Sequence, residues 1–445
     1  MDATPAPSGT PDADGFPSPE VLACIRDIPL YQPSLARGRF PILEKPDIAR
    51  GFPDNWMTPR LAAALESGEA EYVLSTGTNH ARMQLIRPPY FLLRSYYRLW
   101  SEHPDLAHTW ESGCRRVSLT TVLATEHVAR VNARKNGTEP AAEPSLDDRR
   151  LDDRTLYLNL HLDPAQWSRD DVARMLAEIR RVRAEHPKGD YHLDCSGYHL
   201  AHLVHRAEAF GLWNPEDFPR PASIVTAYEY PPANVRRYLT DRFDVPVIDL
   251  FGSTELGYLF HGDRHGRYHP YLDRMSVELV PVAPGSGIHS LIVTSIRNPY
   301  MPLVRYRSGD CVRTADGSPD PAEITAFCGR EKELLTTPHG PVAHADVDDV
   351  VTAAAPQVFL ARLDVAAGGP AAPARLHYTT FDGRPLDADR ASALASGLSA
   401  LTGRPCTAVH RAHLPIGKSG KYPWLAAHDD PAAAPAAQPP QGGTA

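Results

Sequence analysis

The stretch Asp249-Leu250-Phe251-Gly252-Ser253-Thr254-Glu255-Leu256-Gly257 carries an apolar strand directly into a turn flanked by glycines. The turn presents two hydroxyls and the carboxylate of Glu255. Proteins of the α/β class place ligand-binding groups at the carboxyl ends of strands. A carboxylate there is a hard oxygen ligand that can hold Mg²⁺ against a phosphate group. The alternative for the same residues is a strand-to-loop turn in which Ser253 or Thr254 caps a helix.

On either side of this stretch, short apolar runs alternate with amphipathic stretches of helical period, and this order predicts an α/β fold. The runs are residues 155–160, 245–250, 276–282 and 291–296. A helix is predicted from Ser168, whose hydroxyl can cap it while Asp171 completes a capping box, as far as Pro187.

The composition indicates a globular protein with more than one core. The chain has 445 residues, 42% hydrophobic and 22% charged, and single cores stop growing at roughly 250 to 300 residues. The net charge of −8 without a basic block argues against a nucleic-acid partner. No apolar run reaches the roughly 18 residues of a membrane helix, and six dispersed cysteines suit a reducing compartment. We therefore expect a cytoplasmic protein.

Both ends of the chain are rich in Pro, Ala and Gly and contain almost no large apolar side chains. Such segments cannot offset the entropy lost on ordering. Residues 1–18 and 430–445 are therefore predicted to be disordered.

Three further segments carry polar groups suited to a nucleotide. The run from Pro302 ends on Ser308-Gly309-Asp310, and an ionised Asp can accept both hydroxyls of a ribose. The guanidinium of Arg330, in Cys328-Gly329-Arg330, can bridge nucleotide oxygens. Pro415-Ile416-Gly417-Lys418-Ser419-Gly420-Lys421 offers a lysine on a glycine-containing loop. Taken singly, these segments are equally consistent with tight turns and a solvated basic loop.

Together, the segments occur in the order and spacing of the adenylate-forming superfamily, which this chain resembles. Phe40-Pro41-Ile42-Leu43-Glu44-Lys45-Pro46-Asp47-Ile48 is similar to the phenylacetate-coenzyme A ligase branch of that superfamily. The resemblance implies a large N-terminal adenylate-forming domain, residues 19–329, and a small mobile C-terminal α/β lid, residues 330–429. Glu333 occupies the family's hinge position.

The resemblance also implies roles for single residues. Glu255 would bind Mg²⁺ and ATP, Asp310 the ribose, and Arg330 the nucleotide at the domain junction. Lys421 matches the lysine of the family's Ser-Gly-Lys loop, which contacts the carboxylate and the α-phosphate during adenylation. The implied ATP-binding set also includes Gly252, Ser253 and Thr254.

Ala227-Tyr228-Glu229 resembles the family's small Gly-Ala-Glu turn beside the adenine, with a bulky tyrosine in the middle. Tyr228 and Glu229 are therefore implied ATP-binding residues, and Tyr228 would shape the purine or acyl pocket. The alternative is a buried aromatic ring whose hydroxyl is hydrogen-bonded.

The phosphate loop departs from the family's pattern. It reads Ser75-Thr76-Gly77-Thr78-Asn79-His80, so a histidine replaces the second glycine, and no lysine follows. The hydroxyls of Ser75, Thr76 and Thr78 remain as donors beside the backbone of Gly77, and Arg82 or Arg87 can supply positive charge. This change favours one alternative, a degenerate relative that binds a nucleotide without turning it over.

A structural zinc occurs in some members of the branch, held by Cys and His from the loop after the acidic motif and from a Cys-x-Cys before Gly-Arg. Here His261, His269 and Cys328 keep such positions, Ala326 has lost one, and Cys311 can substitute. The candidate zinc set is His261, His269, Cys311 and Cys328.

The resemblance implies an ATP-dependent carboxylate ligase. It would convert an acid, aromatic by family analogy, to its acyl-adenylate with release of pyrophosphate, and then transfer the acyl group to a thiol such as coenzyme A. A carrier protein or an amine is the alternative acceptor. Tyr198, Tyr228 and Phe251 are candidates to line the acyl pocket.

Overall fold

The computed structural model describes residues 17–74, 83–186, 188, 190–214, 220–263, 267–366 and 372–428. The chain divides into two compact units, Met1–Lys332 with Ile416–Lys421, and Glu333–Pro415 with Tyr422–Ala445. The boundary falls at 332/333 and not at the expected 329/330. Residues 416–421, expected in the lid, belong to the large unit.

A seven-stranded sheet organises the large unit, in the order β4-β3-β5-β6-β7-β8-β9. The first five strands in this order are parallel, and β8 and β9 are antiparallel to their neighbours. The strands are β3 (Arg115–Leu119), β4 (Thr155–Tyr157), β5 (Tyr191–Cys195), β6 (Ser223–Thr226), β7 (Val247–Ser253), β8 (Gly257–Gly262) and β9 (Tyr268–Pro270).

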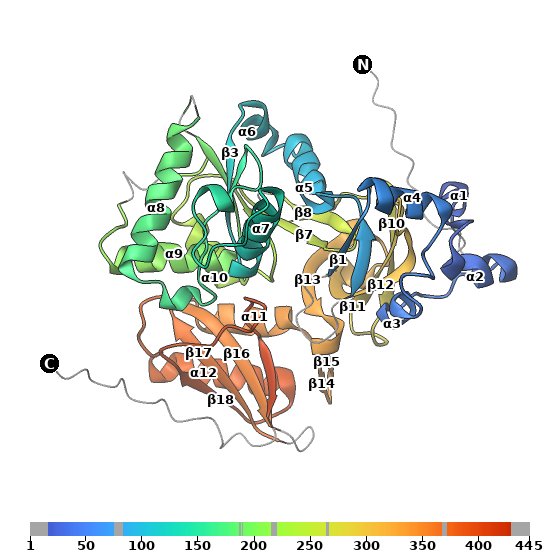
Figure 1. Ribbon diagram of the computed structural model, residues 1–445. Helices are drawn as coiled ribbons and strands as arrows, with labels where there is room; N and C mark the ends of the chain where they lie inside the picture. The colour runs from blue at the N-terminus through green and yellow to red at the C-terminus, as the bar shows by residue number, and fades with distance from the viewer. Residues whose placement is uncertain are drawn as a thin grey trace. The chain divides into compact units, whose positions relative to one another are not determined.

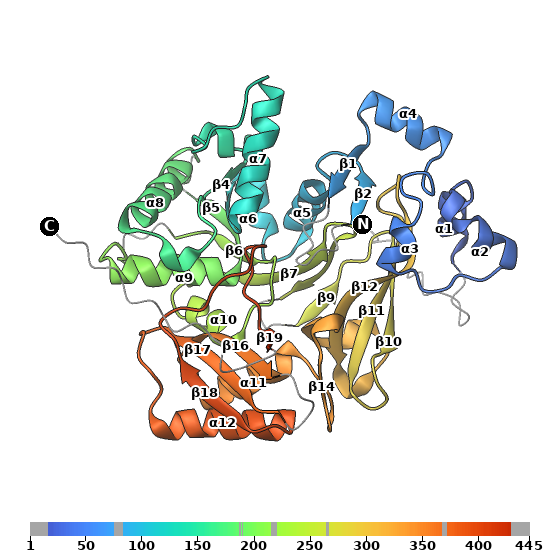
Figure 2. The same cartoon turned by 60° about the horizontal axis from the view of Figure 1, so that its bottom comes forward.

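The helices cover both faces of this sheet. The connection from β3 to β4 through α7 (Val122–Lys135) runs in one direction across the sheet. Those through α8 (Arg169–Ala184), α9 (Gly197–Ala209) and α10 (Ala233–Thr240) run in the other. Since such crossovers are right-handed, α7 lies on the opposite face from α8 to α10. Figure 2 shows α8 and α9 on one side, and α5 (Phe91–Glu102), α6 (Ala107–Glu111) and α7 on the other.

The change of direction places the topological switch point between β3 and β5. Ligands of open α/β sheets bind at such a point, beyond the carboxyl ends of the strands. These ends are Leu119 and Cys195, so the segments that follow them, Thr120-Thr121 and Ser196-Gly197, border the expected site.

The predicted helix start at Ser168 is confirmed. The Ser168 hydroxyl accepts the backbone N–H of Asp171 at 3.1 Å, and the Asp171 carboxylate accepts the N–H of Ser168 at 2.8 Å. The α8 helix then buries Val172, Met175, Leu176 and Ile179, and ends at Ala184, before Pro187.

A second sheet of the large unit is antiparallel, in the order β10-β11-β12-β13. Figure 1 shows the N-terminal helices (blue) beside this sheet. Phe327 of β13 stacks on Phe251 of β7 at 3.9 Å between ring centroids, which joins the two sheets in one core. The elements are β10 (Met275–Pro281), β11 (Ile288–Ser295), β12 (Leu303–Thr314), β13 (Ile324–Arg330), the hairpin β1 (Glu71–Leu74) and β2 (Gln84–Arg87), and helices α1 (Pro19–Ile25), α2 (Gln32–Arg37), α3 (Lys45–Ala49) and α4 (Pro59–Ser67).

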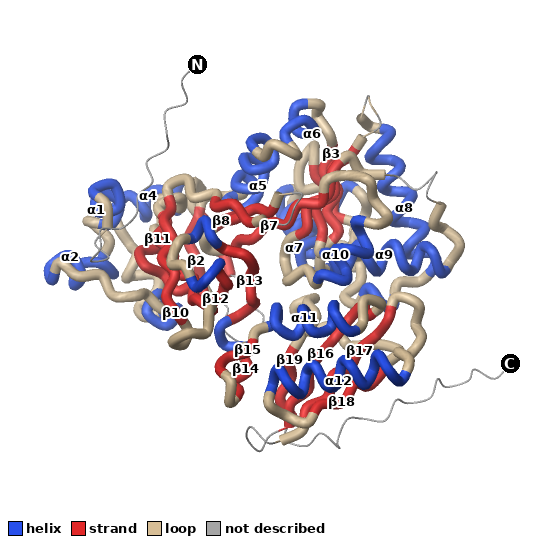
Figure 3. The backbone as a smooth tube through the Cα atoms, turned by 180° about the vertical axis from the view of Figure 1, so that it is seen from behind, coloured by secondary structure: helices blue, strands red, loops and turns tan. Residues whose placement is uncertain are grey.

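The small unit is an α/β domain with its own core around Leu363, Leu376, Leu394 and Leu398, all fully buried. Its four-stranded sheet has the order β18-β17-β16-β19, and Figure 3 shows α12 lying across these strands. The elements are β14 (Leu335–Thr337), β15 (Gly340–Val342), α11 (His344–Ala354), β16 (Val358–Ala366), β17 (Ala374–Thr380), α12 (Ala388–Thr402), β18 (Cys406–His410) and β19 (Leu425–His428).

Short 3₁₀ turns complete the two units, at Pro29–Tyr31, Asp147–Arg149, Pro164–Gln166, Ala315–Gly317, Pro321–Glu323 and Glu331–Glu333. Among the described helices, none has the length and apolar character needed to cross a membrane. The α/β class and the large and small domains predicted from the sequence are confirmed.

Candidate functional site

Glu255 lies at the tip of the β7–β8 hairpin. Gly252 faces Tyr258 across the hairpin, and a Cβ at Gly252 would overlap the Gly257 carbonyl and lie 2.7 Å from the Tyr258 Cα. Gly257 has a φ of +76°, which glycine adopts readily. The Ser253 hydroxyl accepts the N–H of Leu256 at 3.3 Å. Because a strand follows the turn, the interpretation of Ser253 or Thr254 as a helix cap is wrong.

The Glu255 side chain is buried, and one of its oxygens is held by Tyr306. The Tyr306 hydroxyl donates to Glu255 Oε1 at 3.0 Å. Burial, reinforced by the Glu255 charge, raises the pKa of Tyr306, so the hydroxyl keeps the proton that it donates. The hydrogen bond from Tyr306 is made to Oε1. A buried carboxylate is a hard oxygen ligand that fits a divalent cation such as Mg²⁺.

Asp310 and Arg330 pair across β12 and β13, as their register places them opposite each other. Arg330 Nη1 lies 3.2 Å from Asp310 Oδ1 and also donates to the Ser308 carbonyl at 3.2 Å. Burial raises the pKa of Asp310. The Arg330 guanidinium opposes that shift. Smaller contributions come from Glu255, which raises the pKa, and from Lys45 and Lys421, which lower it. Glu255, Arg330 and Lys421 therefore each act on the charge of Asp310.

The loop that carries Lys421 is closed by its own backbone. The N–H of Gly417 donates to the Lys421 carbonyl at 2.9 Å, and the N–H of Gly420 donates to the Gly417 carbonyl at 2.8 Å. A Cβ at Gly420 would overlap the Thr121 hydroxyl and lie 2.6 Å from the Thr121 Cβ. Because Thr121 follows β3 directly, the loop lies at the topological switch point, and glycine permits its approach.

Gly420→Ala is therefore expected to displace the Lys421 loop and to lower adenylation by an order of magnitude or more, since misplaced groups lose their catalytic effect. The rate of acid-dependent exchange of pyrophosphate into ATP measures the adenylation activity of this variant. Gly383→Ala is the matched control, because Gly383 has a similar φ of +71° but no atom within 4 Å of its added Cβ. Equal loss in both variants would attribute the effect to backbone strain alone.

Tyr228 occupies a strained turn after β6. Its φ is +79°, a region in which bulky residues are rare and which is often found at functional sites. Its hydroxyl donates to Asp194 Oδ2 at 2.7 Å. Glu229 Oε1 accepts a hydrogen bond from the Ser196 hydroxyl, directly after β5. Tyr228 and Glu229 therefore border the carboxyl end of β5. The Tyr228 hydroxyl is also hydrogen-bonded, as expected if Tyr228 is a buried aromatic residue of the fold.

A buried ion pair beside Tyr228 was missed from the sequence. Arg116 and Asp194 have side chains only 3% and 0% exposed, and Arg116 Nε donates to Asp194 Oδ2 at 3.1 Å. The Arg116 guanidinium stacks over Tyr96, 4.1 Å from the ring centroid. Arg116 Nη1 and Asp194 Oδ1 have no hydrogen-bond partner among the described residues. The sequence signal that could have revealed this pair was Asp194, a charged residue within the otherwise strand-like run Tyr191–Cys195.

Asp194→Ala should lower the free energy of unfolding by about 3 to 5 kcal/mol, because it leaves the Arg116 charge buried without a partner. Urea denaturation followed by circular dichroism measures this change. Glu139→Ala, at an exposed position, is the control and should have little effect. A loss of less than about 1 kcal/mol for Asp194→Ala would contradict the burial argument.

The phosphate-loop residues Ser75, Thr76, Gly77 and Thr78, and Arg82, lie outside the described residues. Arg87, at the end of β2, donates from Nη1 to the carbonyl of Thr254 at 3.4 Å. The guanidinium of Arg87, which was considered for phosphate binding, therefore lies next to Glu255.

Glu333, the predicted hinge residue, is the first residue of the small unit and ends the 3₁₀ turn Glu331–Glu333. Its role as the hinge stays a prediction.

The candidate zinc set is not assembled. His261 and His269 face each other on β8 and β9, with ring centroids 5.6 Å apart, whereas Cys311 and Cys328 are buried on β12 and β13. Phe327 of β13 packs on the seven-stranded sheet, and the pairing of β13 with β12 is irregular at Cys328. The four do not form a compact ligand group within the described part of the chain.

Comparison with known proteins gives matches in structure only. No family model and no curated protein sequence matches the chain. A crystal structure of 2-hydroxyisobutyryl-CoA ligase in the postadenylation state with R3-HIB-AMP aligns over 96% of this chain and 94% of that one, with a TM-score of 0.63 and 12% identity. A benzoate CoA ligase from Burkholderia xenovorans LB400 aligns over 79% and 67%, with a TM-score of 0.53 and 15% identity. The anthranilate CoA ligase AuaEII with anthranoyl-AMP aligns over 79% and 65%, with a TM-score of 0.51 and 14% identity.

The chain therefore shares the fold of these solved CoA ligases, as the order of its motifs predicts.

Proposed function

We propose that this protein uses ATP to convert a carboxylic acid to its acyl-adenylate, with release of pyrophosphate, and then transfers the acyl group to a thiol, with coenzyme A as the acceptor. The observation that carries this proposal is the grouping of Glu255, Asp310, Arg330 and Lys421 in one compact unit. These residues come from four separate segments of the chain, and each offers a group that adenylation requires.

The roles follow from charge and hydrogen-bonding capacity. Asp310, oriented by Arg330, can accept the ribose hydroxyls. Lys421, held by its closed loop, offsets the repulsion between the attacking carboxylate and the α-phosphate, and so stabilises charge that develops during the reaction. Mg²⁺ held by Glu255 Oε2 would neutralise phosphate charge. Positioning of the two reactants supplies a large share of the remaining rate increase.

The acid that we propose is aromatic. Tyr198 is buried at the start of α9, and Tyr228 lies across the β5 and β6 ends, so both border the switch point. Phe251 is less suited to contact an acid, because its ring already stacks on Phe327. The benzoate and anthranilate CoA ligases among the structural neighbours support an aromatic acid, whereas 2-hydroxyisobutyryl-CoA ligase supports a small hydroxy acid.

Exchange of labelled pyrophosphate into ATP, measured across a panel of acids, tests the proposal. Benzoates and arylacetates form one arm, and short hydroxy acids the other. Exchange stimulated by an acid supports adenylation, and the best acid identifies the class. Nucleotide binding without exchange for any acid would support the non-catalytic alternative instead. Coenzyme A, a carrier protein and amines, supplied with the best acid, then identify the acceptor.

A further inference from the structure

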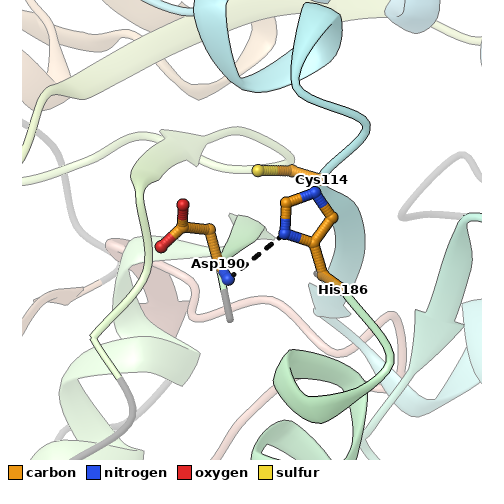
Figure 4. A group of neighbouring side chains, drawn as sticks. All are labelled: Cys114, His186 and Asp190. Carbon is orange, nitrogen blue, oxygen red and sulfur yellow. Dashed lines mark hydrogen bonds between the residues drawn. The ribbon is translucent and has the colours of Figure 1, made fainter. Parts of the chain in front are cut away.

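Cys114, His186 and Asp190 form a cluster away from the proposed nucleotide site (Figure 4). Cys114 directly precedes β3, Asp190 directly precedes β5, and His186 follows the end of α8. Their potential ligand atoms all lie within 4.8 Å of one another. Within the described ranges, no other group of three or more His, Cys, Asp or Glu residues meets this criterion. The cluster is at the amino ends of the strands, whereas the nucleotide residues follow the carboxyl ends.

The hydrogen bonds of His186 fix its tautomer. Its Nε2 lies 2.7 Å from the Ser112 carbonyl oxygen, which can only accept, so Nε2 carries the proton. Nδ1 then bears the lone pair, which accepts long hydrogen bonds from the N–H groups of Lys188 and Asp190 at 3.3 and 3.5 Å, and a bound cation would replace these two contacts. A ring N–H donated to a backbone carbonyl while the other nitrogen faces a cluster is the usual arrangement of metal-binding histidines.

The other two side chains present acceptor atoms to the same space. Figure 4 shows the Cys114 sulfur and the Asp190 carboxylate on the side of the imidazole that bears Nδ1. The Ser112 hydroxyl lies 3.4 Å from the Cys114 sulfur and can donate to it. Because Cys114 is only 1% exposed and His186 5%, water solvates this group of acceptors poorly. A bound cation would stabilise such an arrangement.

We propose that Cys114, His186 and Asp190 bind a zinc ion through the thiolate, Nδ1 and one carboxylate oxygen, with water as the fourth ligand. Mixed sulfur, nitrogen and oxygen ligands in a tetrahedral set favour zinc over the harder Mg²⁺ and Ca²⁺. The burial of Cys114 argues against the same trio acting as a cysteine nucleophile, because a substrate must reach the sulfur. The ion would tie the end of α8 to the starts of β3 and β5.

Binding replaces the thiol proton with the metal, so one proton is released for each ion bound at a pH where the thiol is protonated. The affinity should therefore fall as the pH is lowered. Because zinc would bind the folded protein and stabilise it by mass action, a chelator should lower its melting temperature.

The test uses the full-length protein, purified from zinc-supplemented medium, and elemental analysis. We expect about one zinc per chain, and a thiolate-to-cobalt charge-transfer absorption after replacement by Co²⁺. Cys114→Ala and Asp190→Asn should each lower the zinc affinity by about tenfold or more. Asp190→Asn preserves shape at a half-buried position, so it stays informative if Cys114→Ala does not fold.

Cys328→Ala is the matched control, since it removes another buried cysteine that belongs to the zinc set expected from the sequence. It should retain zinc and the cobalt absorption. Loss of zinc in Cys328→Ala with retention in Cys114→Ala and Asp190→Asn would overturn the proposal in favour of the sequence-based set. Absence of zinc and of cobalt absorption from the wild-type protein would overturn both.

Discussion

Lys421→Ala is expected to lower acid-dependent exchange of pyrophosphate into ATP by about two to three orders of magnitude, the usual effect of removing one well-placed electrostatic group. ATP binding should change little, because Asp310 and Arg330 hold the nucleotide in the proposed site. Exchange kinetics and equilibrium titration with ATP measure the two quantities separately.

The matched control is Lys418→Ala. Lys418 belongs to the same loop, three residues before Lys421, but its side chain is exposed, whereas Lys421 is half-buried and acts on Asp310. Its removal should leave exchange nearly unchanged. If Lys418→Ala is the more damaging change, the alignment of this loop with the family's Ser-Gly-Lys loop is wrong.

The features predicted well from the sequence are those that local residues determine. Ser168 and Asp171 lie three residues apart and complete a capping box by themselves, so the start of α8 needed no knowledge of the rest of the chain. The turn after β7 was predicted in the same way, although the strand β8 that follows it was not. The close approach of the two backbones requires Gly252 and Gly257.

The features that were missed depend on strand register and on long-range packing. Arg116 and Asp194 are 78 positions apart, and only the parallel pairing of β3 with β5 makes them a buried pair. The zinc set also depends on long-range packing. His261 and His269 lie on β8 and β9, whereas Cys311 and Cys328 are buried on β12 and β13. Only the packing of the two sheets decides how close these pairs come, and they do not form a ligand group among the described residues.

Glu255→Gln is expected to lower Mg²⁺-dependent turnover by about two orders of magnitude or more, because it preserves the shape of the side chain but removes its charge. The carboxylate is buried, so solvent screens its charge poorly and the loss is large. The Mg²⁺ concentration that gives half-maximal exchange should rise in the same variant, and exchange measured over a Mg²⁺ series gives both values.

Tyr306→Phe separates the metal role of Glu255 from its role in the fold. This variant removes the hydrogen bond to Oε1 but leaves the carboxylate charge and Oε2 in place. It should therefore shift the Mg²⁺ dependence much less than Glu255→Gln, whose amide oxygen can still accept the Tyr306 hydrogen bond while the charge is lost. Full activity of Glu255→Gln at low Mg²⁺ would remove the metal from Glu255. Equal shifts in the two variants would instead show that the charge of Glu255 is not what sets the Mg²⁺ dependence.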